Sequence, residues 1–196
     1  MIFNVILFDG FETLDAFGPV EVIGRLADDY TLAYHSGNGG IVKSSQQIPI
    51  DTLPFINMDT SGVLLIPGGM GTRKLAEDTA FIKQLKTLIE KAPYVLTVCT
   101  GSALLARTGL LSGKNATSNK AAFEWVCSNG AGVNWIKKAR WVKDGKYYTS
   151  SGISAGIDMA LGFVSDLHGV ATAREIAKSI EYIWNSDADN DPFAVG

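Results

Sequence analysis

The sequence predicts an α/β fold, a mainly parallel sheet with helices on both faces, from three observations. Short β-branched apolar runs alternate with helical patterns along the chain, which is typical of a parallel sheet with crossover helices. Runs such as GVLLIP at 62–67 are continuously apolar, as expected for strands that are buried on two sides. The 196 residues suffice for one compact domain and are few for two, so we expect a single domain over 1–196.

The expected elements follow in chain order. The first half contains a strand at 2–8, a helix at 19–27, a strand at 30–36, two short antiparallel pieces at 41–43 and 47–50, a strand at 62–67, a helix at 81–92 and a strand at 94–99. The second half contains a helix from about 100, a helix at 121–130, a hairpin at 139–152 that turns at Asp144 and Gly145, and helices at 153–169 and 171–184. From about 186 the polar tail is expected to pack loosely.

Composition excludes several classes of function. The net charge is −3 and no block of Lys and Arg occurs, so nucleic acid is not an expected partner. No apolar run approaches the roughly 20 residues that cross a bilayer, and the N-terminus lacks the features of a secretion signal, which predicts a cytoplasmic protein without a membrane partner. The two cysteines, Cys99 and Cys127, form neither a disulfide framework nor a metal cluster. No metal site is expected.

Cys99 is the first candidate catalytic residue, because it lies where the predicted strand YVLTV ends and a predicted helix begins. Ligands of α/β sheets gather at this edge, and the amides and dipole of a helix N-terminus favour a thiolate. We therefore expect a lowered pKa for Cys99. A lone cysteine is equally well explained as a small buried apolar residue, so position alone leaves both interpretations open. Cys127, inside a helical pattern, is interpreted as structural.

Asp15 is the candidate acid, because Leu14, Ala16 and Phe17 surround it with apolar neighbours. Such surroundings raise the pKa of a carboxyl group, so that it can hold a proton near neutral pH. The other acidic residues of this stretch, Asp9, Glu12 and Glu21, are interpreted as solvated or capping.

Two further features bear on this site. The turn IPGG at 66–69 brings Gly68 and Gly69 after a buried strand, where backbone amides could face an anionic intermediate. His35 and His168 both have structural explanations, so a protease-like Cys/His/Asp arrangement is not supported.

Four ordered motifs, LDAFGP, IPGG, VCTGS and GISAGIDMAL, with DPFAVG near the end, resemble the DJ-1/PfpI (ThiJ) family over almost the whole chain. Their combination is most similar to the isonitrile hydratase branch and to the ligand-sensor domains of AraC-type regulators. The resemblance implies a flavodoxin-like three-layer sandwich of the class I glutamine amidotransferase type, with the cysteine on a strained elbow, and a homodimer.

The same resemblance implies roles for individual residues. Cys99 would attack the terminal carbon of an isonitrile, Asp15 would assist protonation, and water would release an N-substituted formamide. The backbone amides of Thr100 and Gly69 would form an oxyanion site beside Gly68. No cofactor is implied. The pocket for the small-molecule substrate would be shaped by side chains that include Phe17, Met70 and Asn119.

Two alternatives stay open at this point. A glyoxalase or redox-stress protein of the DJ-1 branch would use the same cysteine and a neighbouring acid, although a glutamate is usual there and Asp15 stands here. A stand-alone ligand-sensing domain is the other, although no DNA-binding helix-turn-helix follows before Gly196. One departure concerns the ATSNK segment, where Asn119 replaces a histidine of many relatives, and an amide cannot exchange protons as an imidazole does.

Overall fold

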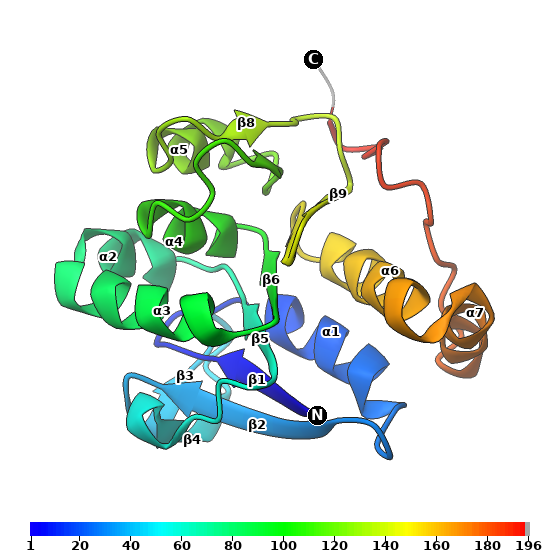
Figure 1. Ribbon diagram of the computed structural model, residues 1–196, viewed down its shortest axis with the longest axis horizontal. Coiled ribbons are helices and arrows are strands. Elements are labelled where there is room, and N and C mark those ends of the chain that lie inside the picture. The colour runs from blue at the N-terminus through cyan, green and yellow to red at the C-terminus, as the bar shows by residue number, and fades with distance from the viewer. Residues whose placement is uncertain (195–196) are drawn as a thin grey trace.

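A computed structural model describes residues 1–194, in which one eight-stranded sheet has the order β3-β4-β2-β1-β5-β6-β10-β9 (Figure 1). Its strands are β1 (Ile2–Ile6), β2 (Thr31–Ser36), β3 (Asn38–Lys43), β4 (Pro49–Pro54), β5 (Val63–Ile66), β6 (Tyr94–Val98), β9 (Trp141–Asp144) and β10 (Tyr147–Ser150). A small parallel pair joins β7 (Asn115–Ala116) to β8 (Asn134–Trp135). The helices are α1 (Thr13–Gly24), α2 (Gly71–Glu77), α3 (Thr79–Lys91), α4 (Gly101–Arg107), α5 (Phe123–Ser128), α6 (Ala155–His168) and α7 (Val170–Ser179), with a 3₁₀ turn η1 (Phe55–Asn57).

The sheet is parallel except at its two edges. Strands β4, β2, β1, β5, β6 and β10 run parallel, whereas β3 and β9 each pair antiparallel with a neighbour. The predicted antiparallel excursion and the hairpin are therefore confirmed. Since β4 also joins β2, the excursion extends the main sheet and does not form a separate unit.

Helices cover both faces, which confirms the predicted three-layer α/β fold. Figure 1 shows α1, α6 and α7 on one side of the sheet and α2, α3 and α4 on the other. Helix α3 buries Phe81, Leu85 and Ile89, a spacing of four that places them on one helical face. Strand β5 is buried at all four positions, as its continuous apolar run predicts.

Two helix boundaries differ from the prediction by five residues or more. Helix α1 begins at Thr13 and contains Pro19 within it, so that Asp15 and Ala16 lie on its buried face. The last helix ends at Ser179, five residues early, because Glu181 has a φ of 52°, which an α-helix does not tolerate.

The C-terminal tail exposes most of its side chains within the described residues, but it is anchored to the body of the fold at two points. The Asp191 side chain is buried, and the carbonyl oxygen of Ala188 accepts a hydrogen bond of 2.7 Å from the Arg140 amide. The Ala188 carbonyl oxygen also accepts from the Trp141 amide, so the tail is attached to the start of β9. Residues 195 and 196, the end of the DPFAVG motif, lie outside the described residues. Within 1–194 no helix has the length and apolar character needed to cross a membrane.

Candidate active site

Cys99 occupies a strained elbow between β6 and α4. Its φ is 56°, a left-handed conformation that costs a residue other than glycine about 1–3 kcal/mol. Its amide donates to the carbonyl oxygen of Ser151 at 3.1 Å, and its own carbonyl oxygen accepts from Ser118 Oγ at 2.7 Å. Hydrogen bonds on both sides therefore hold the strained residue in place. The predicted strand-to-helix elbow is confirmed.

Asp15 lies fully buried in the first turn of α1, at the same edge of the sheet. Its Oδ2 accepts a hydrogen bond of 2.9 Å from the Gly68 amide, while its Oδ1 has no hydrogen-bond partner among residues 1–194. Burial raises the pKa of Asp15 to about 7 and outweighs the Gly68 hydrogen bond, which lowers it. The carboxyl group is thus about half protonated near neutral pH, as its apolar neighbours predict.

The thiol of Cys99 has a raised pKa, which contradicts the expectation of a helix-stabilised thiolate. Burial of this residue, which is 7% exposed, is the main cause, and the charge of Asp15 adds to it. The amides of Thr100 and Ile153 and the Thr100 hydroxyl lower the pKa, but by less. The stable form near neutral pH is therefore a thiol beside a carboxyl group that titrates. Negative charge develops on the sulfur only when the sulfur attacks a substrate.

The glycine turn brings the backbone against this pair. A Cβ on Gly68 would lie 2.6 Å from the Thr100 amide nitrogen and 2.8 Å from Asp15 Oδ2, closer than real Cβ atoms approach, so only glycine fits. The amide of Gly69 donates to Thr100 Oγ1 at 3.0 Å. Because that hydroxyl occupies the amide, Gly69 does not present a free oxyanion donor as expected. The Thr100 amide remains beside the sulfur.

A pocket of about 280 Å³ opens over the sulfur. Its lining includes the predicted Gly69, Met70, Cys99, Thr100 and Asn119, together with Glu12, Arg73, Ala121, Ala122 and Ile153. Phe17 does not line it: its ring packs against Phe11 and Tyr34 and borders a separate groove between α1 and α6. The placement of Phe17 in the substrate pocket is therefore wrong.

The DJ-1/PfpI family model matches residues 3–166. The chain belongs to the DJ-1/PfpI family. Isonitrile hydratase from Pseudomonas putida is 34% identical over 177 residues, which cover 90% of this chain and 76% of that protein. Protein dj-1beta from Drosophila melanogaster is 26% identical over 185 residues, which cover 92% of this chain and 97% of that protein. The crystal structure of a THiJ/PfpI family protein from Pseudomonas syringae superposes with a TM-score of 0.84 at 27% identity, covering 98% of this chain and 76% of that one.

The remaining candidates of this DJ-1/PfpI chain lie away from the pocket. His35 is buried at the end of β2, three strands from β6 in the sheet, and burial lowers its pKa. His168 ends α6 and lies 3.0 Å from the Tyr30 hydroxyl. Cys127 is a half-buried residue of α5. Within residues 1–194 no group of three or more His, Cys, Asp or Glu side chains is arranged to hold a metal ion.

Besides Glu12, Ala121 and Ala122, which line the pocket, the sequence analysis gave no role at the site to three further residues. Ile153, with a φ of 42°, faces the sulfur with its amide. Arg73 stacks on Trp125, with its guanidinium carbon 3.9 Å from the ring centroid, and lines the pocket. Ser118 holds the Cys99 carbonyl. No local sequence pattern marks these three residues, because each contacts a residue that is distant along the chain: Ile153 and Ser118 contact Cys99, and Arg73 contacts Trp125.

Proposed function

We propose that this chain is a cysteine-dependent hydratase that adds water to an isonitrile and forms an N-substituted formamide. The observation that carries the proposal is the buried pair of Cys99 and Asp15, in which a neutral thiol adjoins a carboxyl group with a pKa of about 7. The likeness to the P. putida isonitrile hydratase supports the choice of reaction.

In the first step the Cys99 sulfur forms a bond to the terminal isonitrile carbon. The ionised Asp15 accepts the thiol proton as the sulfur attacks, and then delivers this proton to the same carbon. The product is a thioimidate, R–N=CH–S–Cys99, and Asp15 is again a carboxylate. Because the proton moves only within the pair, no free thiolate has to form in the buried site. This agrees with the raised pKa of the thiol.

In the second step Asp15 removes a proton from water while the water oxygen bonds to the thioimidate carbon, and the nitrogen receives that proton. The C–S bond then breaks, the sulfur recovers a proton from the new hydroxyl group, and R–NH–CHO leaves. The reaction consumes one water molecule and requires no external oxidant or reductant. The Thr100 amide, which faces the sulfur, stabilises charge on it as the bond breaks.

The groove that contains Phe17 supports a second element of the proposal, a homodimer. It measures about 390 Å³, and its lining combines apolar residues, including Leu14, Ile157 and Ile180, with the Glu21–Arg25 ion pair of α1. Leu14 is 42% exposed in one copy of the chain. Sedimentation equilibrium should give twice the 21.0 kDa chain mass, and a mass of one chain would contradict this element.

The test of the reaction is steady-state turnover of phenyl isonitrile beside methylglyoxal, with product identified by chromatography. Production of N-phenylformamide supports the hydratase. Production of lactate would select the glyoxalase alternative instead, and no turnover of either would favour a ligand-sensing domain. Cys127→Ser is the matched control, because it removes the only other thiol, and its rate should equal that of the wild type.

A further inference from the structure

A buried cluster of charges lies next to the elbow and includes a residue of the C-terminal tail. Asp191, whose side chain is fully buried, lies 3.4 Å from the Arg140 guanidinium and 3.6 Å from the Lys120 ammonium. Asp158 also pairs with Arg140, at 2.8 Å. Two cations and two carboxylates balance in this cluster, so removal of any one leaves an uncompensated charge.

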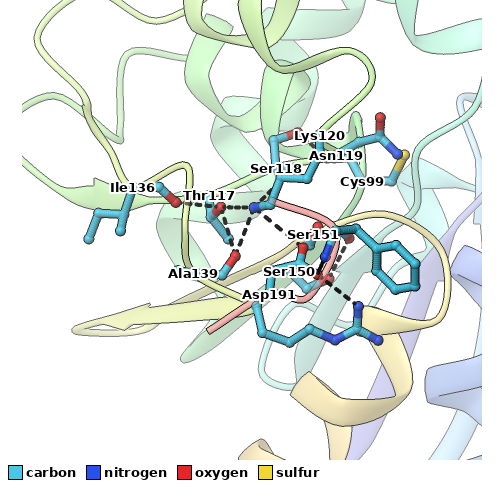
Figure 2. A network of polar contacts seen from close by, with 12 residues as sticks. Cys99, Thr117, Ser118, Asn119, Lys120, Ile136, Ala139, Ser150, Ser151 and Asp191 are labelled. Carbon is cyan, nitrogen blue, oxygen red and sulfur yellow. Dashed lines mark hydrogen bonds and ion pairs between the residues drawn. The ribbon is translucent and has the colours of Figure 1, made fainter. Parts of the chain in front are cut away.

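Lys120 connects this cluster to the loop that precedes α5. Its ammonium donates to Thr117 Oγ1 at 3.0 Å and to the carbonyl oxygens of Ala139 at 2.8 Å and Ser118 at 3.3 Å (Figure 2). Burial of this amine lowers its pKa, whereas Asp191 raises it. Lys120 is therefore a rigid link between the tail and the loop 117–120.

The same loop holds the nucleophile. Ser118, which precedes Lys120 by two residues, donates from Oγ to the Cys99 carbonyl oxygen at 2.7 Å. On the other side, the Cys99 amide donates to the Ser151 carbonyl oxygen, and the Ser151 amide donates to the Arg140 carbonyl oxygen at 2.9 Å. Both peptide groups of the strained residue are thus bonded to segments that contact Asp191 through Lys120 or Arg140.

We propose that Asp191 of the C-terminal tail is a positioning residue, which acts through Lys120 and Ser118 to keep Cys99 in its strained, buried conformation. A residue with positive φ persists only where its surroundings hold it, and these contacts are the surroundings on the carbonyl side of Cys99. The inference rests on Cys99 as the proposed nucleophile, but it is independent of which substrate the protein converts.

The test is the rate of alkylation of Cys99 by iodoacetamide as a function of pH, in a Cys127→Ser background. The titratable and charged groups that face the thiol or line its pocket are Asp15, Glu12 and Arg73, and all three stay unchanged. Asp191→Asn should let Cys99 leave its strained conformation and should expose the thiol to water. The pKa of the Cys99 thiol then falls toward its ordinary value. We expect alkylation at pH 8 to be about tenfold faster than in the wild type.

Asp189→Asn is the matched control, because Asp189 is exposed in the same tail segment, and it should keep the wild-type profile. A folded Asp191→Asn with that same profile would overturn the inference. If circular dichroism shows that Asp191→Asn does not fold, Ser118→Ala decides, since it removes the last bond of the chain of contacts without changing any charge. Its profile should shift relative to Ser128→Ala, a hydroxyl of α5 that bonds only within its helix; an unshifted profile would overturn the inference. Alkylation requires no isonitrile turnover, so this result is separate from the test of the proposed reaction.

Discussion

Asp15→Asn should make the protein more stable above neutral pH, although it removes the proposed acid. The folded state raises the pKa of Asp15 from 3.8 to about 7, so it binds the proton more tightly than the unfolded chain does. The contribution of this group to stability is complete below pH 3.8 and is lost as the pH rises through about 7. Three pKa units at about 1.4 kcal/mol each give a cost of about 4 kcal/mol above pH 7. Asparagine is close in shape, its oxygen can accept the Gly68 hydrogen bond, and it carries no charge.

The assay is urea unfolding of wild type and Asp15→Asn at pH 4.5 and pH 8. Since the unfolded carboxyl group is already mostly ionised at pH 4.5, the stability advantage of the variant should grow by about 3 kcal/mol between these two values. Asp144→Asn is the control without a pH-dependent difference in this range. Hydrogen bonds from the Asn115 amide and Lys114 lower the pKa of Asp144, so its carboxyl group is mostly ionised at both pH values in the folded and unfolded chain, and the stability difference between this variant and wild type should change little between pH 4.5 and pH 8. A difference between wild type and Asp15→Asn that does not change with pH would refute the reasoning.

Three other predictions concern activity. The profile of kcat/KM against pH should rise through an apparent pKa of about 7, because the ionised form of Asp15 accepts the thiol proton; a profile that is flat from pH 5 to pH 8 would assign this role elsewhere. Gly68→Ala should lower kcat at least about tenfold, since its Cβ would displace the Thr100 amide or Asp15, whereas Gly37→Ala, which has open space around it and no positive φ, should keep kcat. Arg73→Met should raise KM for an isonitrile that bears a carboxylate more than for a neutral one, because the stacked guanidinium lines the pocket; equal effects on both would contradict this.

The parts of the fold that local patterns encode were predictable. The continuous apolar run of β5 and the four-residue spacing of α3 each point to one structure, and the apolar neighbours of Asp15 predict its raised pKa. Helix boundaries were harder to predict. Helix α7 ends where Glu181 adopts a left-handed backbone conformation, and no local sequence pattern indicates that conformation.

Burial decides two features near the site that the sequence does not display. Hydrogen bonds at the helix N-terminus lower the pKa of the Cys99 thiol, but desolvation of the buried sulfur raises it by more. The polar tail contains one deeply buried side chain, Asp191, which pairs with Arg140, 51 positions earlier. Phe17 shares a short motif with Asp15, but successive side chains on a helix point in different directions.

The most direct test of the central claim is formamide production by Cys99→Ala at pH 8, compared with wild type under the same conditions. Thermal unfolding should first show that the variant is folded, since alanine fills the buried site with a smaller apolar group. Covalent catalysis by Cys99 predicts that the rate falls about a thousandfold or more, because alanine has no group that can form the bond to the isonitrile carbon. A folded Cys99→Ala that retains a wild-type rate would contradict covalent catalysis at the elbow.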